Sequence, residues 1–305
     1  MRQTVAAAPS VSFDLRRSWE DLVALPDKRL TIDEIVAEIQ DGMTIGVGGW
    51  GSRRKPMALV RALVRSDKKD LTVVSYGGPD VGLLCRAGKV RHVVYAFVSL
   101  DTIPLEPHFR NARQSGAVSA TELDEGMFLL GLQAAAWRMP FLPTRVGLGS
   151  DIIAANPHMQ TVECPYTTEK FLAMPAFDID VALIHMHRGD LGGNGQYLNV
   201  DPYFDDLFCM AASKSFMSVE KVVPTEQFLS EGPVQSLRIS RLMVNGVVET
   251  PNGAHFTECP PDYARDEAFQ KEYAASAKSD EAWATFRAKY LDVSEAEYQS
   301  QVGAR

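Results

Sequence analysis

The chain has 305 residues, of which 46% are hydrophobic and 23% are charged, as in an ordinary globular protein. Its formal net charge of -8 argues against nucleic-acid binding, because such binding needs a basic face that displaces counterions. An acyl-CoA ligand remains compatible with this charge, since a local basic cluster can hold a phosphate on an acidic protein.

The cysteines and the apolar segments bear on the compartment. The four cysteines are widely spaced and form no CxxC pair, so the sequence contains neither a zinc knuckle nor a thioredoxin-like motif. They are Cys85, Cys164, Cys209 and Cys259. The N-terminus lacks an apolar core of signal-peptide length, and no apolar run approaches the ~20 residues of a membrane helix. We therefore expect a cytoplasmic protein with reduced thiols and no membrane association.

The expected elements alternate between helices and strands. Residues 1–12 read as a disordered tail, and Thr31 and Glu34 form a capping-box pattern ahead of helically spaced apolar residues. In chain order we expect helix 31–39, strand 43–47, helix 57–65, strand 70–77, strand 90–99, helix 124–139, strand 179–186, helix 205–213, strand 235–247 and helix 266–291.

This alternation predicts an α/β fold with an open, mostly parallel sheet and helices on both faces. Neither a low-complexity linker nor a fixed-period repeat divides the chain. We expect one α/β domain over residues 13–250, with a helical extension at 251–305 packed on the same domain.

A glycine-rich loop follows the first strand. Residues 46–51, GVGGWG, satisfy the GxGxxG pattern of dinucleotide sites. Two features argue against a dinucleotide site: residues 52–55 separate the loop from the helix that begins near Pro56, and the next strand ends without an acidic residue for a ribose hydroxyl. A purely structural tight turn is a further alternative.

We favour a loop whose backbone N–H groups stabilise an oxyanion or thioester. The residues concerned are Gly48, Gly49, Trp50 and Gly51. Arg53, Arg54 and Lys55 follow and add positive charge, from which we expect Arg53 and Arg54 to contact the substrate. The competing interpretation of the three cations is a solvated surface patch.

Two segments resemble a known family. GMTIGVGGWGSRRKP (42–56) resembles the GxGGFxxxxxP loop in α subunits of class I CoA-transferases, with Trp50 where Phe is usual. ELDEGMFLLGLQAAAWRMPFLPTRVGLGSDI (122–152) is similar to that family's E-x-x-E-G helix, PF-x-P and G-x-G-[ST]-D stretches. The resemblance covers roughly residues 28–250 and implies the open sheet shared with ribose-5-phosphate isomerase and glucosamine-6-phosphate deaminase.

The resemblance also implies a partner. The α subunits of the family work beside a β subunit, which predicts a heteromer, expected to be α2β2. The transferase nucleophile is a glutamate in an S-E-N-G or similar motif on the β half, and this chain contains no ENG tripeptide. A nucleophile, if the reaction uses one, would therefore belong to another chain.

One glutamate departs from the usual family pattern. FVSLDTIPLEPHFRNAR (97–113) is related to a family stretch ending in x-P-x-FR, which usually has no carboxylate before the proline. Glu106, with His108 and Arg110, resembles the IpdA-type subunits of actinobacterial hydrolases that cleave a cholesterol ring. The resemblance places Glu106 in the active site and implies water attack on a ring ketone, cleavage of the neighbouring C–C bond, and CoA left attached.

The residues are compatible with that role. Pro104 and Pro107 stiffen the backbone around Glu106, and a partly desolvated carboxylate has a raised pKa suited to a general base. We expect Arg110 to bind substrate. The structural alternative is a surface glutamate paired with Arg110 or Arg113.

Other candidates have simpler explanations. His185 and His187 share a strand face and could bind a metal, but core or interface histidines are favoured. Residues 189–196 read first as a turn and second as a CoA contact. Glu122, Asp124 and Glu125 are either a carboxylate site or charges at a helix N-terminus. We expect no metal and no redox cofactor, with CoA as part of the substrate.

Three functions remain open at this point: hydrolysis of a C–C bond in a steroid-derived acyl-CoA, CoA transfer between carboxylic acids, and a scaffold subunit whose partner holds all catalytic side chains. A nucleophilic glutamate on the β chain would favour transfer. A mutation of Glu106 that left activity unchanged would favour the scaffold.

Overall fold

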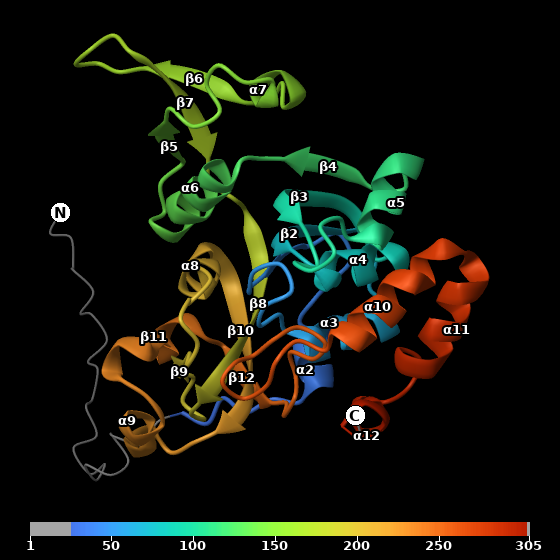
Figure 1. The fold of residues 1–305 in the computed structure, drawn as a ribbon. Coiled ribbons are helices and arrows are strands. Elements are labelled where there is room, and N and C mark those ends of the chain that lie inside the picture. The colour runs from blue at the N-terminus through green and yellow to red at the C-terminus, as the bar shows by residue number, and fades with distance from the viewer. Residues whose placement is uncertain (1–25, 304–305) are drawn as a thin grey trace, which may run out of the picture.

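The computed structural model describes residues 26–303 (Figure 1). The tail expected at residues 1–12 lies outside the described residues.

The centre of the fold is a sheet of nine strands within residues 26–303. Its parallel strands run in the order β12-β10-β8-β1-β2-β3-β4. Their bounds are β1 Thr44–Val47, β2 Leu71–Gly77, β3 Val90–Val98, β4 Ser119–Glu122, β8 Ile179–Gly189, β10 Ala212–Val222 and β12 Gly246–Glu249. The short strands β9 (Gly195–Gln196) and β11 (Leu237–Ile239) add an antiparallel annex at the end of β8. The expected mostly parallel sheet is confirmed.

Helices cover both faces of the sheet, because neighbouring strand residues point to opposite sides. Val73 belongs to one apolar core and Val74 to the other. The first core includes α2 (Ile32–Ala37), α3 (Met57–Arg65), α4 (Pro79–Arg86) and α5 (Pro107–Ser115). The second includes α6 (Glu125–Ala136) and α8 (Asp205–Ala211).

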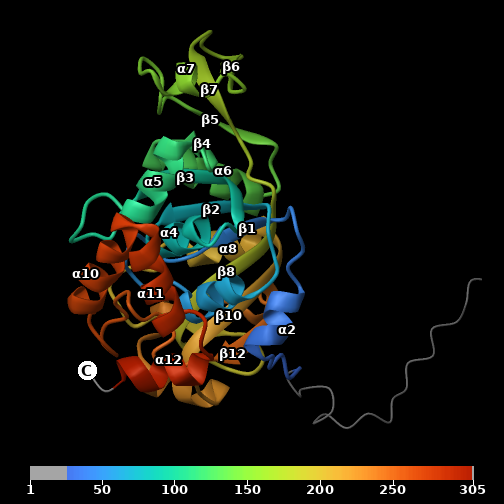
Figure 2. The same cartoon turned by 90° about the vertical axis from the view of Figure 1, so that its right-hand side faces the viewer.

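A small arm projects from this body at the top of Figures 1 and 2. It is a three-stranded antiparallel sheet in the order β5-β7-β6, and its elements are β5 (Phe141–Thr144), α7 (Ile152–Ala155), β6 (Gln160–Glu163) and β7 (Lys170–Pro175). Large apolar side chains are exposed on the arm and beside it: Trp137, Met139, Phe141 and Tyr166.

The C-terminal segment forms three helices rather than the one expected at 266–291. They are α10 (Glu267–Ala275), α11 (Asp280–Tyr290) and α12 (Glu295–Val302). A 3-10 turn at Ser276–Lys278 and the Ser279 cap of α11 break the expected helix. These helices lie on the side of the sheet that carries α3 and α4 (Figure 2), and their aromatic residues extend the first core.

Two other expected elements were wrong in extent. The helix expected at 205–213 ends at Ala211, and the chain passes directly into β10, a strand that the sequence did not predict. The strand expected at 235–247 is β11, a 3-10 turn at Arg241–Met243 and β12, because Ser240 caps that turn through the Leu242 amide. Helix α9 (Phe228–Glu231) precedes it, and α4 and α5 were also not predicted.

Candidate active site

Glu106 lies at the N-terminus of α5, on the loop that follows β3. Its Oε1 accepts a hydrogen bond from the His108 amide at 3.2 Å, and its Oε2 accepts one from the Phe109 amide at 2.5 Å. Pro107 occupies the first helical position, where its missing N–H costs nothing. Pro107 and Glu106 thus set the start of α5 and the position of this carboxylate. The carboxylate lies beyond the carboxyl end of β3, and open α/β sheets bind ligands at the carboxyl ends of their strands.

A third donor reaches the same carboxylate from the C-terminal segment. The Tyr273 hydroxyl of α10 donates to Glu106 Oε1 at 2.8 Å. A carboxylate offers about four acceptor positions. Two donors therefore occupy Oε1 and one occupies Oε2, which leaves an acceptor position on Oε2.

The environment of Glu106 favours proton transfer near neutral pH. Burial, with a smaller effect of the Asp80 charge, raises the pKa of Glu106 to about 7 against the opposing effect of the three hydrogen bonds. A group with this pKa is well matched to general-base work at the pH of a cell. Because Glu106 is 1% exposed, it is not the surface glutamate of the structural alternative.

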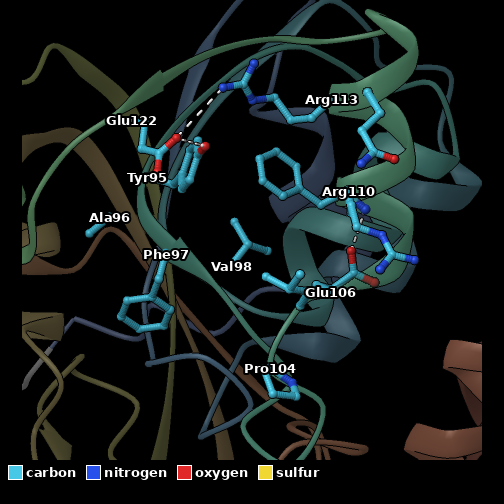
Figure 3. Close-up of a pocket in the computed structure, with 12 residues that line it drawn as sticks. Tyr95, Ala96, Phe97, Val98, Pro104, Glu106, Arg110, Arg113 and Glu122 are labelled. Atoms are coloured by element: carbon cyan, nitrogen blue, oxygen red, sulfur yellow. Dashed lines mark hydrogen bonds and ion pairs between the residues drawn. The ribbon is translucent and has the colours of Figure 1, made fainter. Parts of the chain in front are cut away.

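Glu106 borders a pocket of about 470 Å³ between β3 and α5 (Figure 3). Tyr95, Ala96 and Phe97 of β3 form one wall, and the α5 side carries the exposed side chain of Arg110. Arg113 also lines the pocket, but its guanidinium lies 3.9 Å from Glu122 Oε2. The pocket thus combines an aromatic wall with Arg110 beside the candidate base, while Arg113 lies at the Glu122 end (Figure 3).

The backbone amides of the glycine loop already have acceptors within the protein. Each of its four amides donates within the chain: Gly48 to Leu183 O at 2.9 Å, Gly49 to Asp205 Oδ1 at 2.8 Å, Trp50 to Arg53 O at 3.0 Å and Gly51 to Tyr76 O at 3.1 Å. Gly49 has a φ of +75°, and a Cβ there would lie 2.6 Å from Arg53 O. Glycine is therefore required for the turn itself, and an oxyanion role would require one of these hydrogen bonds to break.

Two of the three basic residues after the loop face inward, which corrects the expected cluster. Arg54 is completely buried, and its Nη1 lies 2.7 Å from Asp205 Oδ2. Lys55 is also buried, 3.2 Å from Asp80, and burial lowers its pKa. The expected substrate contact of Arg54 does not fit this placement. Arg53 keeps a side chain that is 40% exposed, 3.1 Å from Asp101 Oδ2.

Trp50 joins an aromatic cluster instead of extending into solvent. Its ring stacks on Tyr76 at 4.5 Å and lies 5.0 Å from Phe97. Phe97 also lines the pocket beside Glu106. Trp50 thus connects the glycine loop to the apolar wall of that pocket.

The two histidines on β8 are built into the interior. His185 is hydrogen-bonded to Ser218 Oγ and Glu220 Oε1, both at 2.8 Å. His187 Nε2 donates to Pro260 O, and its Nδ1 accepts from the Leu198 amide. Both ring nitrogens of each histidine are thus engaged in hydrogen bonds within the protein. Among the described residues, His185 and Glu220 do form a group with Cys259 that has metal-ligating atoms within 4.8 Å.

Two residues that shape this site, Tyr273 and Gly82, were not predicted from the sequence. Tyr273 is 167 positions from Glu106 and carries no motif. A Cβ at Gly82 would lie 2.2 Å from the Glu106 carboxyl carbon, so only glycine leaves room for that carboxylate. Glycine inside a helix is a signal of close approach, but it does not identify the neighbour.

The comparison with family models decides the family. Residues 29–250 match the model described as coenzyme A transferase. The chain belongs to the coenzyme A transferase family. Within this family it is 55% identical over 288 residues to the cholesterol ring-cleaving hydrolase IpdA subunit of Rhodococcus jostii, covering 92% of this chain and 97% of that one. The protein of the same name from Mycobacterium tuberculosis is 54% identical over 285 residues, covering 91% and 98%.

Solved structures agree with the fold. Glutaconate coenzyme A-transferase from Acidaminococcus fermentans superimposes with a TM-score of 0.85 at 24% identity, covering 91% of this chain and 93% of that one. The decarboxylase AibA/AibB matches with a TM-score of 0.74 at 28% identity, covering 90% and 98%. Among the described residues, no helix is both long enough and apolar enough to cross a membrane.

Proposed function

We propose that this chain is the α subunit of a heteromeric hydrolase that opens a ring C–C bond of a steroid-derived keto-acyl-CoA. The similarity to subunits named as cholesterol ring-cleaving hydrolases, at 54% and 55% identity over most of both chains, supports the substrate class. The observation that carries the chemistry is Glu106, a buried carboxylate with a pKa of about 7 beside a pocket.

Glu106 acts as a general base in this proposal. Water binds at the open acceptor position of Oε2 and gives a proton to the carboxylate as its oxygen attacks the ring ketone. The resulting tetrahedral adduct collapses to a carboxylic acid, and the electron pair of the broken C–C bond passes to the neighbouring carbon. That carbon takes up the proton from Glu106, so the base is regenerated and the CoA thioester remains intact.

The other predicted residues have supporting roles. Arg110 is exposed at the pocket and binds an anionic group of the substrate. Arg53 offers a second, partly exposed cation at the end of the glycine loop. Trp50 packs behind Phe97 and shapes the apolar wall. The reaction needs no metal or redox cofactor, since water, base and ketone balance it.

The names of the relatives support the proposal of a partner chain. The similar proteins are named as subunits, both in the ring-cleaving hydrolase of Rhodococcus jostii and in the glutaconate CoA-transferase of Acidaminococcus fermentans. In our proposal the obligate partner is a β subunit, and the assembly is α2β2.

CoA transfer is the second candidate, because one chain of the 3-oxoadipate CoA-transferase from Pseudomonas knackmussii is 26% identical over 268 residues. Turnover of a keto-acyl-CoA by the complex in ¹⁸O-water separates the two. Hydrolysis places one ¹⁸O in the new carboxylate and leaves no adduct for hydroxylamine to trap. A hydroxylamine-sensitive glutamyl-CoA thioester on β, with no C–C cleavage, would instead establish transfer.

A further inference from the structure

The active-site carboxylate receives a hydrogen bond from outside the family match. The matched region ends at residue 250, whereas Tyr273 lies on α10. Tyr273 is fully buried, and its hydroxyl donates to Glu106 Oε1 at 2.8 Å. Its ring is fixed by neighbours of the same segment, with Phe256 at 5.0 Å and Phe286 at 5.7 Å. The hydroxyl is therefore rigidly aimed at the carboxylate.

Gly82 on α4 also lies against the Glu106 carboxylate. A Cβ at this position would lie between 2.2 and 2.4 Å from three carboxyl atoms of Glu106. Real Cβ atoms do not approach that closely, so a side chain at position 82 would displace the carboxylate. Tyr273 thus holds the carboxylate through a hydrogen bond, and Gly82 leaves the space that the carboxylate occupies.

We propose that Tyr273 is a positioning residue for Glu106, holding Oε1 so that Oε2 faces the reacting water, and that Gly82 provides the space for this orientation. The inference rests on the proposed function of Glu106. It assigns the C-terminal segment a part in the chemistry, since α10 supplies the donor. Without that donor, Glu106 keeps only its two amide hydrogen bonds at the start of α5.

The hydrogen bond also tunes the protonation of Glu106. Donation to the charged form favours that form, so Tyr273 lowers the pKa of Glu106 and its loss raises it. The other titratable groups facing this pair are Asp80 and Cys85 on α4, and His108, whose pKa burial lowers to about 4. None of these groups is altered by removing one hydroxyl, so Tyr273→Phe isolates the effect of the hydrogen bond.

The test compares Tyr273→Phe with Tyr298→Phe in the complex with the partner chain. Both tyrosines are fully buried in the C-terminal segment, but the Tyr298 hydroxyl is bonded to His255 Nδ1 at 2.7 Å. Tyr273→Phe should move the acid limb of the kcat/KM profile about one pH unit upward. Loss of a hydrogen bond to the charged form of a carboxyl group typically raises its pKa by about one unit or more. The fall at low pH should be in kcat, with KM little changed. Tyr298→Phe should leave the limb in place.

Infrared titration of the Glu106 carboxyl band, assigned by its loss in Glu106→Gln, measures the same pKa without relying on turnover. A folded Tyr273→Phe variant whose band and acid limb match the wild type would overturn the inference. If Glu106→Gln kept full activity, the proposed function would fail, while the infrared shift would still decide whether Tyr273 controls Glu106.

Gly82→Ala tests the second residue beside the carboxylate. Alanine favours helix more than glycine does, so the change should not weaken α4 by itself. We expect a folded complex in which kcat falls at least tenfold and the Glu106 band shifts. A folded Gly82→Ala variant with wild-type kcat and an unchanged band would contradict the role of Gly82.

Discussion

At the scale of single residues, the catalytic role that we propose for Glu106 carries a cost in stability. Its pKa is about 7 in the folded chain, compared with an ordinary value of 4.5. The folded state therefore holds the proton more tightly than the unfolded state does, and the unfavourable contribution of Glu106 is absent below pH 4.5. This contribution grows as the pH rises to about 7. Burial that makes Glu106 suitable as a base therefore lowers the free energy of unfolding at neutral pH.

Glu106→Gln should accordingly stabilise the protein more at pH 8 than at pH 4. The amide keeps the size of the side chain but avoids a buried charge, and the gain at pH 8 should be on the order of 1–3 kcal/mol. Urea unfolding of the variant and wild type at both pH values measures it. The control is Glu122→Gln, which changes an exposed carboxylate of the same pocket. If Glu106→Gln stabilised the protein equally at both pH values, the raised pKa assigned to Glu106 would be refuted.

Arg54 is a structural residue, which mutagenesis should show directly. Arg54→Gln leaves Asp205 buried without its cation, and burial already raises the pKa of Asp205 to about 6. Removing one partner of a buried pair typically costs about 3–5 kcal/mol. Arg145→Gln breaks a pair with Glu169 in which Arg145 is 68% exposed, and should change the free energy of unfolding far less, because solvent screens exposed pairs. If Arg54→Gln and Arg145→Gln lowered the free energy of unfolding in urea by similar amounts, the structural role of Arg54 would be contradicted.

The position of Glu106 at a helix start was predictable from the sequence, whereas the burial of Arg54 and Lys55 was not. Glu106 stands between Pro104 and Pro107, and this local pattern already indicates a fixed helix start. Arg54 and Lys55 form ion pairs with Asp205 and Asp80, which only the folded sheet brings near. A basic run reads as a surface patch when its buried partners lie elsewhere in the chain.

At the scale of elements, local signals predicted the helix starts better than the strand bounds. The capping box at Thr31 and Glu34 is present as expected. Strand β10 was missed because Lys214, Ser215 and Ser218 interrupt its apolar pattern, although Ser215 and Ser218 are buried beside β8. Pairing with a neighbouring strand overrides such a pattern, and pairing is not visible from one segment.

The capping box of α12 provides an element-scale prediction. Ser294 Oγ accepts from the Glu297 amide at 3.2 Å, and the Glu297 carboxylate accepts from the Ser294 amide at 2.8 Å. Ser294→Ala should cost about 1 kcal/mol and speed amide hydrogen exchange within 295–302. Ser300→Ala makes the same chemical change at an exposed position of this helix and should cost nothing. Equal exchange in the two variants would argue against the cap.

At the scale of the whole molecule, the open parallel sheet was predictable because strands and helices alternate along the chain. The arm at residues 141–175 was not, since its short strands pair only with one another. Tyr166 on the arm and Trp137 beside it are exposed, and no pattern in the sequence predicted that these aromatic side chains would lie on the surface.

The complete enzyme should require two kinds of chain. We expect the isolated protein to fold, because it has two continuous apolar cores, but to lack turnover of acyl-CoA. Co-expression with the partner chain should yield one complex in size-exclusion chromatography, and activity should follow that peak. Full activity of the isolated chain would show that the site is complete without a partner.

The proposed reaction depends most on Glu106 as the base that activates water. The direct measurement is single-turnover ring opening of the keto-acyl-CoA by the complex carrying Glu106→Gln, with substrate affinity measured by calorimetry. The amide fills the same space but cannot take a proton, so the rate should fall by about 10²–10⁴-fold while affinity stays within a few-fold of wild type. A folded Glu106→Gln complex that opens the ring at the wild-type rate would contradict the account.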